Sequence, residues 1–210
     1  GWAGTLADFV ASEQARTLRV LEINEAGTLS PPLRRLPAHV FGAYPALDMQ
    51  AMRFADGSFD LGVHSDTLEH VPDPARALRE CARVLTPQGA LCFTVPVVPG
   101  RMTVSRQGLA PLYHGDPADP TEDLLVHTDY GADVWHLVHE AGFAAVTLSR
   151  FDDALAITAS RRSRRPPATF APPVEDSARR ELQAILNSRS WRVTAPLRAI
   201  VAAVRRLRRD

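Results

Sequence analysis

The chain has 210 residues, a formal net charge of zero at pH 7 and 45% hydrophobic residues, which suits one compact domain with an appendage. No run of about 18 apolar residues occurs, so we expect no transmembrane helix. Cys81 and Cys92 are too few for a disulfide framework, and we expect both to be small buried hydrophobes in a reducing compartment.

The zero net charge conceals an asymmetry along the chain. Residues 1–160 contain 11 Arg against 20 Asp and Glu, whereas residues 161–210 contain 13 Arg against 4 acidic residues. The two regions therefore carry net charges of −9 and +9. Such a division indicates two regions with different partners.

The apolar patterns of the first part predict short helices that alternate with buried strands. Apolar runs of four to six residues are typical of parallel strands covered on both faces. Ser30-Pro31-Pro32 predicts a cap followed by the first turn of a helix. The predicted elements are a helix over 4–16, a strand over 18–23, a short helix after Ser30 and a strand over 39–43.

A strand over 59–64 follows, and then a helix that begins at Asp73-Pro74. Apolar residues recur in this helix with a helical period, so one of its faces should pack on the sheet. We expect Pro87 to end the helix and Gly89 to turn the chain into a strand over 90–95.

Residues 97–128 form a long connection rich in Gly, Pro and Asp, which is typical of a lid or substrate loop. The remaining elements are a helix over 133–141, ended by Gly142, and a closing pair of strands over 144–149 and 154–159. The domain organisation predicted is an α/β domain over 1–160, an Arg- and Pro-rich linker over 161–175 and a basic helical tail over 176–210.

The most specific pattern lies within residues 48–96. It contains Phe54-Ala55-Asp56-Gly57-Ser58-Phe59-Asp60, then Leu68-Glu69-His70-Val71-Pro72-Asp73-Pro74, then Arg83-Val84-Leu85-Thr86-Pro87-Gln88-Gly89. Several residue types agree at fixed offsets, so the series is more specific than a lone glycine motif. In this series, and more loosely over 18–160, the chain resembles the class I S-adenosylmethionine (SAM) dependent methyltransferases, in their type 11-like small-molecule branch.

The resemblance implies an α/β fold with a Rossmann-like doubly wound sheet, whose ligands bind at the carboxyl ends of the strands. It also implies SAM as cofactor and S-adenosylhomocysteine as product. The family normally has a further helix and strand before the position of Asp48. Thr28 and Asp48 are only 20 positions apart, so we expect the sheet to be shortened by one helix–strand unit after the second strand.

The resemblance places the cofactor first at the turn Leu21-Glu22-Ile23-Asn24-Glu25-Ala26-Gly27-Thr28, which corresponds to the family's glycine-rich turn. Glu22 matches its acid. The three glycine positions hold Asn24, Ala26 and Thr28, and Gly27 is displaced by one. Asn tolerates a positive φ better than most residues do, so the turn is expected to persist.

The other cofactor contacts implied lie along the same edge. The ribose-binding acid of the family is absent, and Tyr44 stands nearest its position. Asp48 and Met49 fit the adenine position, where a carboxylate accepts from the amine and the next residue covers the ring; the alternative is a turn Asp and a core Met. Ser65 and Asp66 complete the predicted cofactor site.

His64, Asp66, Glu69 and His70 gather at the end of the strand over 59–64. In the family this loop lies beside the transferred methyl group, so His70 is a candidate general base and Glu69 could orient it or contact the acceptor. A structural role for His70 on the cofactor side has equal weight. His64 is interpreted as locally packed. These side chains are competent metal ligands, but their spacing carries no metal signature, so we expect none.

The long connection offers candidates for substrate binding. Arg101, Arg106, Tyr113 and Asp116 could hold a hydroxylated acceptor, with His114 as an alternative base. The competing interpretation is a polar surface loop.

The tail carries a second, shorter resemblance. Ser188-Arg189-Ser190-Trp191-Arg192-Val193-Thr194-Ala195-Pro196-Leu197-Arg198 resembles a stretch near the ends of some bacterial glycosyltransferases and polysaccharide-assembly proteins. Physically it leads into a basic amphipathic helix. We expect ordinary packing or self-association from it first and contact with an anionic membrane surface second. Docking on the chain's own acidic domain and contact with an acidic protein partner remain alternatives, and nucleic-acid binding is not expected.

Together these features predict a cytoplasmic bacterial methyltransferase, with peripheral membrane contact as an alternative, that acts on a hydroxyl or amine of a sugar-like small molecule or glycan. The rival hypothesis is a catalytically inactive, methyltransferase-like binding or scaffold module in a glycan-assembly system. The altered glycine turn and the absent ribose acid motivate that rival.

Overall fold

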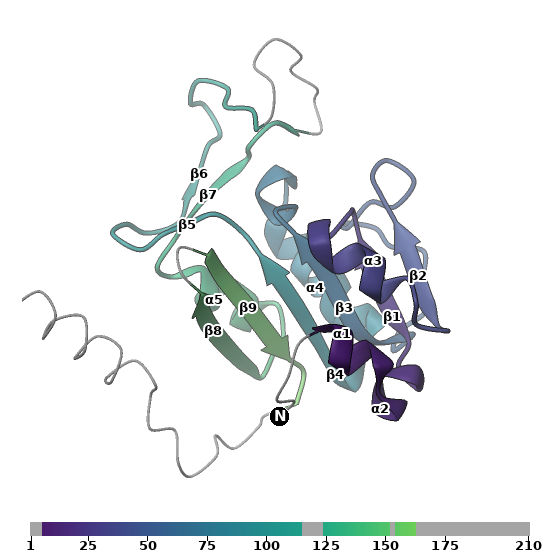
Figure 1. The fold of residues 1–210 in the computed structure, drawn as a ribbon. Helices are drawn as coiled ribbons and strands as arrows, with labels where there is room; N and C mark the ends of the chain where they lie inside the picture. The colour runs from purple at the N-terminus through teal and green to yellow at the C-terminus, as the bar shows by residue number, and fades with distance from the viewer. Residues whose placement is uncertain (1–5, 115–123, 152–153, 163–210) are drawn as a thin grey trace, which may run out of the picture. The chain divides into compact units, whose positions relative to one another are not determined.

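A six-stranded sheet forms the centre of the molecule (Figure 1). The computed structural model describes residues 6–114, 124–151 and 154–162, all of which belong to a compact unit spanning Gly1–Arg164. In sheet order, the strands are β2 (His39–Gly42), β1 (Val20–Ile23), β3 (Phe59–Ser65), β4 (Leu85–Thr94), β9 (Ala154–Ser160) and β8 (Ala145–Phe151). The first four are parallel, whereas β9 and β8 form an antiparallel pair at the far edge.

Helices cover both faces of this sheet (Figure 1). One face packs against α1 (Leu6–Ala11), α2 (Glu13–Arg16) and α3 (Ser30–Leu33), and the other packs against α4 (Pro74–Val84) and α5 (Val134–Glu140). Burial on both faces explains why the parallel strands are apolar throughout. The predicted α/β, Rossmann-like doubly wound fold is confirmed.

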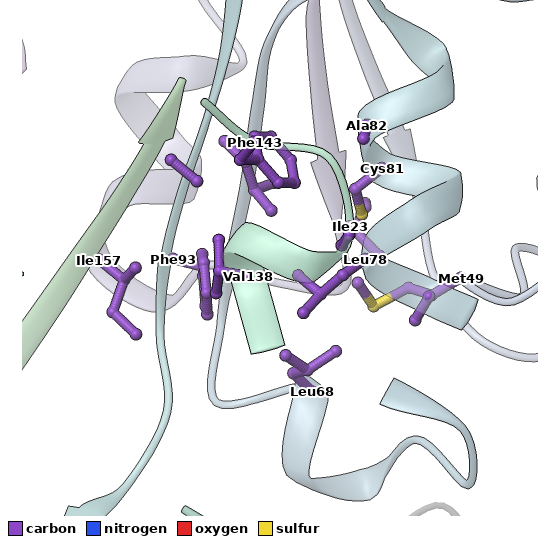
Figure 2. Close-up of a cluster of buried hydrophobic side chains, with 14 of the residues drawn as sticks. Ile23, Met49, Leu68, Leu78, Cys81, Ala82, Phe93, Val138, Phe143 and Ile157 are labelled. Atoms are coloured by element: carbon purple, nitrogen blue, oxygen red, sulfur yellow. The ribbon is translucent and has the colours of Figure 1, made fainter. Parts of the chain in front are cut away.

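Alternation along the strands divides the core into two clusters. In β1, Val20 contributes to the cluster under α1–α3, while Leu21 and Ile23 contribute to the larger cluster under α4 and α5. Figure 2 shows this larger cluster, in which Leu78 of α4 and Val138 of α5 meet the strand side chains. The helical period of α4 therefore buries the face that the sequence predicted.

The sheet is shortened on the β2 side, as predicted. No helix or strand lies between Gly42, the last residue of β2, and Phe59, the first of β3. Within the described residues β2 is consequently an edge strand. Val40 and Phe41 of this strand are exposed because no further element packs beside them.

The single helix predicted over 4–16 is wrong in one respect, since the structure divides it at Ser12. The Ser12 hydroxyl accepts a hydrogen bond from the backbone N–H of Ala15 and thereby caps α2. A serine that satisfies the first N–H groups of a new helix competes with continuation of the preceding one.

The end of α4 also differs from the prediction. The helix stops at Val84, Leu85 is already extended, and β4 runs from there through Pro87 and Gly89. The residue before a proline is disfavoured in the helical conformation, so the helix ends before it reaches Thr86. Pro87 therefore acts through its neighbour, and Gly89 lies in the strand instead of forming a turn.

The long connection is more ordered than a plain loop. Its strands β5 (Val97–Val98) and β6 (Val104–Ser105) flank β7 (Thr128–Gly131) in a second, three-stranded sheet. The backbone of residues 101–102 passes so close to Gly131 that a Cβ atom there would collide with it. Glycine thus permits the two segments to cross.

Several predictions concern other parts of the chain. The linker, the tail and the polysaccharide-assembly resemblance lie outside the described residues and stay predictions. Among the described helices, none has both the length and the apolar character that crossing a membrane requires. Cys81 is buried as expected and Cys92 is partly exposed, and neither forms a disulfide.

His64 of β3 is packed in the core, as the sequence analysis proposed. Its ring stacks on Phe93 with centroids 4.7 Å apart, and neither ring nitrogen has a hydrogen-bond partner among the described residues. Burial lowers the pKa of His64 to about 3, so the ring is neutral at neutral pH.

We expect the wild type to lose stability as the pH falls because His64 is buried in its neutral form, and we expect the substitution His64→Leu to abolish that part of the loss. The pKa is about 3 in the folded protein and about 6.5 in an unfolded chain, so the unfolded state binds the proton first. The free energy of unfolding therefore falls as the pH drops through this window, by up to about 1.4 kcal/mol per pH unit. Urea unfolding at a series of pH values measures the slope.

The matched control is His136→Leu, because His136 lies exposed on α5. That variant should keep the acid-side slope of the wild type. Equal slopes in the wild type and His64→Leu would contradict the assignment of a neutral, buried His64.

Candidate functional site

Two residues with left-handed backbone mark the carboxyl edge of the parallel strands. Asn24 follows β1 with φ of 55°, and Asp66 follows β3 with φ of 44°. They are the described residues other than glycine with positive φ. Because β1 and β3 are neighbours in the sheet, both unusual residues lie at the same edge, and such conformations concentrate at ligand sites.

The side chain of Glu22 forms hydrogen bonds that stabilise the turn after β1. Its carboxylate is fully buried and accepts hydrogen bonds from the Ala26 N–H at 3.0 Å and from His39 Nε2 at 2.8 Å. Burial alone would raise the pKa of Glu22, but these hydrogen bonds outweigh it and lower the pKa below its usual range. The Glu22 side chain therefore stabilises the predicted cofactor turn by binding a backbone N–H of that turn.

The side chain of Asn24 connects three loops of this edge. Its Oδ1 accepts from the N–H of Tyr44, 3.1 Å away, and its Nδ2 lies 3.5 Å from the hydroxyl of Thr67. Tyr44 follows β2, and its side chain is largely exposed. Gly27 also has a left-handed φ, of 56°, with open space where a side chain would stand. The predicted turn persists without its family glycines.

Asp48 and Met49 separate into two roles. Asp48 Oδ1 accepts from the N–H of Gln50 at 2.8 Å, and Gln50 in turn bonds to Asp73 and Arg76 at the start of α4. Met49 is 3% exposed and belongs to the core cluster (Figure 2), which was the alternative interpretation of that residue.

Ser65 and Asp66 are tied to the next strand. The Thr94 hydroxyl lies 2.8 Å from the Ser65 hydroxyl and donates to Asp66 Oδ1 at 3.2 Å. A cavity of about 480 Å³ opens beside these residues at the ends of β3 and β4. Its size lies within the range that small-molecule sites occupy.

The three predicted catalytic residues lie together. Glu69 and His70 belong to the short 3-10 helix η2 (Leu68–His70), which follows the Asp66 loop. Glu69 Oε1 lies 3.9 Å from His70 Nε2 and 3.8 Å from His114 Nδ1. The two imidazole rings meet edge to face with centroids 4.9 Å apart.

Glu69 is the unusual member of this cluster. It is 1% exposed, and neither carboxylate oxygen has a hydrogen-bond partner among the described residues. Burial, assisted by the nearby charge of Asp66, raises the pKa of Glu69 to about 7. A carboxylate without partners in such a place is costly, which marks the cluster as a candidate active site.

His114 reaches the cluster because the long connection returns to the sheet. The backbone N–H of His114 donates to the carbonyl of Leu124, and Tyr113 forms an isolated antiparallel β-bridge with Leu125. The same returning segment supplies the carbonyl of Leu125, which lies 3.1 Å from His70 Nδ1.

The predicted substrate-binding residues do not join the cluster of Glu69, His70 and His114. Arg106 binds Asp129 at 2.8 Å and lines a cavity of about 420 Å³ beside the returning segment. Arg101 is half exposed near Asp129, and Tyr113 is exposed. Asp116 lies outside the described residues, so its assignment stays a prediction.

Sequence reasoning missed the residues that build the cluster from the side of β7. The N–H of His127 donates to the carbonyl of Glu69 at 2.7 Å, and the buried Tyr130 hydroxyl donates to the carbonyl of Leu68. The apolar run at residues 124–126, next to an acidic loop, was a signal of a return to the core that the sequence analysis did not use.

Comparisons with known proteins relate the part of the chain that forms most of this edge to methyltransferases. Residues 28–93 match the family described as "Methyltransferase domain". This match supports the class I methyltransferase resemblance over the segment that contains Asp48, the Ser65-Asp66 loop and η2. The turn at Asn24 lies before the matched residues.

Curated relatives are similar over longer stretches. A probable S-adenosylmethionine-dependent methyltransferase of Mycobacterium tuberculosis is 39% identical over 120 residues, covering 53% of this chain and 38% of that protein. A ubiquinone biosynthesis O-methyltransferase of Ralstonia nicotianae is 30% identical over 92 residues, covering 43% of this chain and 38% of that protein. The chain thus spans little more than a third of the length of these relatives.

Among solved structures, an S-adenosylmethionine dependent methyltransferase from Mesorhizobium loti is 16% identical with a TM-score of 0.46, over 75% of this chain and 99% of that one.

We expect the turn after β1 to depend on the backbone freedom of Asn24. Asn24→Gly keeps the left-handed conformation, whereas Asn24→Val places a β-branched side chain at φ of 55°. Both variants lose the hydrogen bond from Tyr44, so their difference isolates the backbone strain. The valine variant should be less stable by about 1 kcal/mol or more in urea unfolding. Equal losses would contradict this account.

Proposed function

We propose that the protein is a SAM-dependent methyltransferase whose acceptor is a hydroxyl or amine of a sugar-like small molecule or glycan. The observation that carries the proposal is the cluster of the buried Glu69 with the partly exposed His70 and His114, beside the strand-end loops of a chain whose residues 28–93 match the methyltransferase domain family. An acceptor held there would lie next to the predicted cofactor loops.

The residues that would hold the cofactor fit its chemistry. The left-handed turn at Asn24 and Gly27 allows the backbone to approach a ligand, and the open space at Gly27 leaves room for one. Tyr44, Asp48 and the Ser65-Asp66 loop would offer the polar contacts for the ribose, the adenine and the amino group. When bound, SAM supplies a methyl group on a positively charged sulfur.

The acceptor side would be formed by the Glu69 cluster and the long connection. Methyl transfer is an in-line displacement, so the protein chiefly orients the acceptor and removes its proton. His70 or His114 would take that proton from the acceptor. Their rings contact each other, and Glu69 Oε1 lies less than 4 Å from a nitrogen of each. Arg101, Arg106, Tyr113 and Asp116 are proposed to bind the remainder of the acceptor.

Two observations support the class of acceptor. The relative from Ralstonia is named an O-methyltransferase, which favours a hydroxyl. The resemblance of residues 188–198 to polysaccharide-assembly proteins favours a sugar-like molecule. The free cysteines Cys81 and Cys92 suit a cytoplasmic place of action. All of these inferences belong to the proposal.

We expect the full chain to bind S-adenosylhomocysteine in isothermal titration, because the product shares every group of the cofactor except the methyl. Asn24→Val should weaken that binding by about tenfold or more, since it disturbs the turn that approaches the ligand. His114→Ala, on the acceptor side, is the matched control and should bind as the wild type does.

A folded wild-type chain that takes up no S-adenosylhomocysteine at millimolar ligand would overturn the proposal. That outcome would favour the inactive binding or scaffold module, which the loss of the family's glycines after β1 already makes the rival.

A further inference from the structure

We propose that Glu69, His70 and His114 form a site for one divalent cation of the first transition row, with zinc as the expected occupant. Each residue offers one ligand atom, and these three atoms lie within 4.8 Å of one another. Two imidazoles and one carboxylate are a donor set that catalytic zinc sites and non-haem iron sites use.

The strongest argument is the state of Glu69. Both oxygens of this buried carboxylate lack a hydrogen-bond donor among the described residues. Asp66 adds a second negative charge nearby. Buried carboxylates are ordinarily paired with a cation or coordinate a metal, and here the atoms facing Glu69 are imidazole nitrogens, which are themselves ligands.

His70 is oriented as a metal ligand would be. Its Nδ1 lies 3.1 Å from the backbone carbonyl of Leu125, which directs its Nε2 towards Glu69 Oε1. A carbonyl that accepts from Nδ1–H fixes the tautomer that leaves Nε2 unprotonated, and metal-binding histidines usually have such a partner.

The distances suit a site that closes on its ion. Ligands at about 2.0–2.1 Å from zinc in a tetrahedron lie roughly 3.4 Å from one another. The separations of 3.8 and 3.9 Å from Glu69 Oε1 need to shorten by about 0.5 Å. The third separation, between the two imidazole nitrogens, is bounded at 4.8 Å and needs to shorten by up to about 1.4 Å, which a rotation of the partly exposed His114 side chain can supply. The side chain of His114 is 39% exposed, which provides a path for entry.

Three protein ligands leave one position of a tetrahedral ion open, and that position gives the cation a function that rests on the proposed methyl transfer. With both imidazoles bound to the cation, neither acts as the base, and an acceptor hydroxyl in the open position instead loses its proton to water, because the cation stabilises the alkoxide. The oxygen then attacks the methyl carbon of SAM, the carbon–sulfur bond breaks, and its electron pair stays on S-adenosylhomocysteine. An amine would gain less, since coordination occupies its lone pair. The site therefore favours a hydroxyl acceptor.

The test is metal binding by the full chain after treatment with a chelator. Zn²⁺ titrated by calorimetry should bind with a stoichiometry of one, and Co²⁺ should give visible absorption bands typical of nitrogen and oxygen ligation. His114→Ala and Glu69→Gln should each weaken binding by at least about tenfold. His136→Ala, at an exposed histidine beside Glu140, is the matched control and should leave the affinity unchanged.

Glu69→Gln also separates ligand loss from misfolding. It keeps the volume of the side chain, so the variant should unfold at or above the temperature of the metal-free wild type while losing the stabilisation that Zn²⁺ confers. Absence of stoichiometric binding, or binding that His114→Ala and Glu69→Gln leave unchanged, would overturn the inference. Binding of S-adenosylhomocysteine is measured separately, so failure of the metal site and failure of the methyltransferase proposal are distinguishable.

Discussion

The contact between η2 and the segment 124–130 holds the candidate site together. The carbonyl of Glu69 accepts a hydrogen bond from the backbone N–H of His127, and the carbonyl of Leu68 accepts one from the Tyr130 hydroxyl. The ring nitrogen Nδ1 of His70 lies within hydrogen-bond distance of the carbonyl of Leu125. These hydrogen bonds fasten the returning end of the long connection to the loop after β3. The same segment pairs with Tyr113 and His114, which places His114 beside Glu69. The cluster therefore depends on a backbone arrangement.

The edge proposed to bind the cofactor is built by different interactions. The family's glycine turn is replaced by Asn24 in a left-handed conformation, and Glu22 holds that turn through the backbone N–H of Ala26. The omitted helix–strand unit leaves β2 as an edge and Tyr44 exposed at its end. Helices cover both faces of the sheet beside the neighbouring strands β1 and β3.

Much of the fold could be predicted because its signals are local. The apolar runs of β1 and β3, the Asp73-Pro74 start of α4 and the shortened sheet are all confirmed. The errors arose where neighbouring residues compete: Ser12 caps a second helix, and Pro87 ends α4 through the residue before it. Met49 shows the same limit, since its spacing suited either the core or a ligand, and only packing selects the core.

By itself, the sequence determined the fold class, the turn proposed to bind the cofactor and the candidates Glu69, His70 and His114, because residue types at fixed offsets report local geometry. Only the tertiary structure decided that His114 reaches Glu69, since 44 positions separate it from His70 and no periodicity links them. The cation site has the same origin. Its ligands lack a metal spacing in the chain, and they converge because the segment 124–130 returns to pair with the loop at the end of β3.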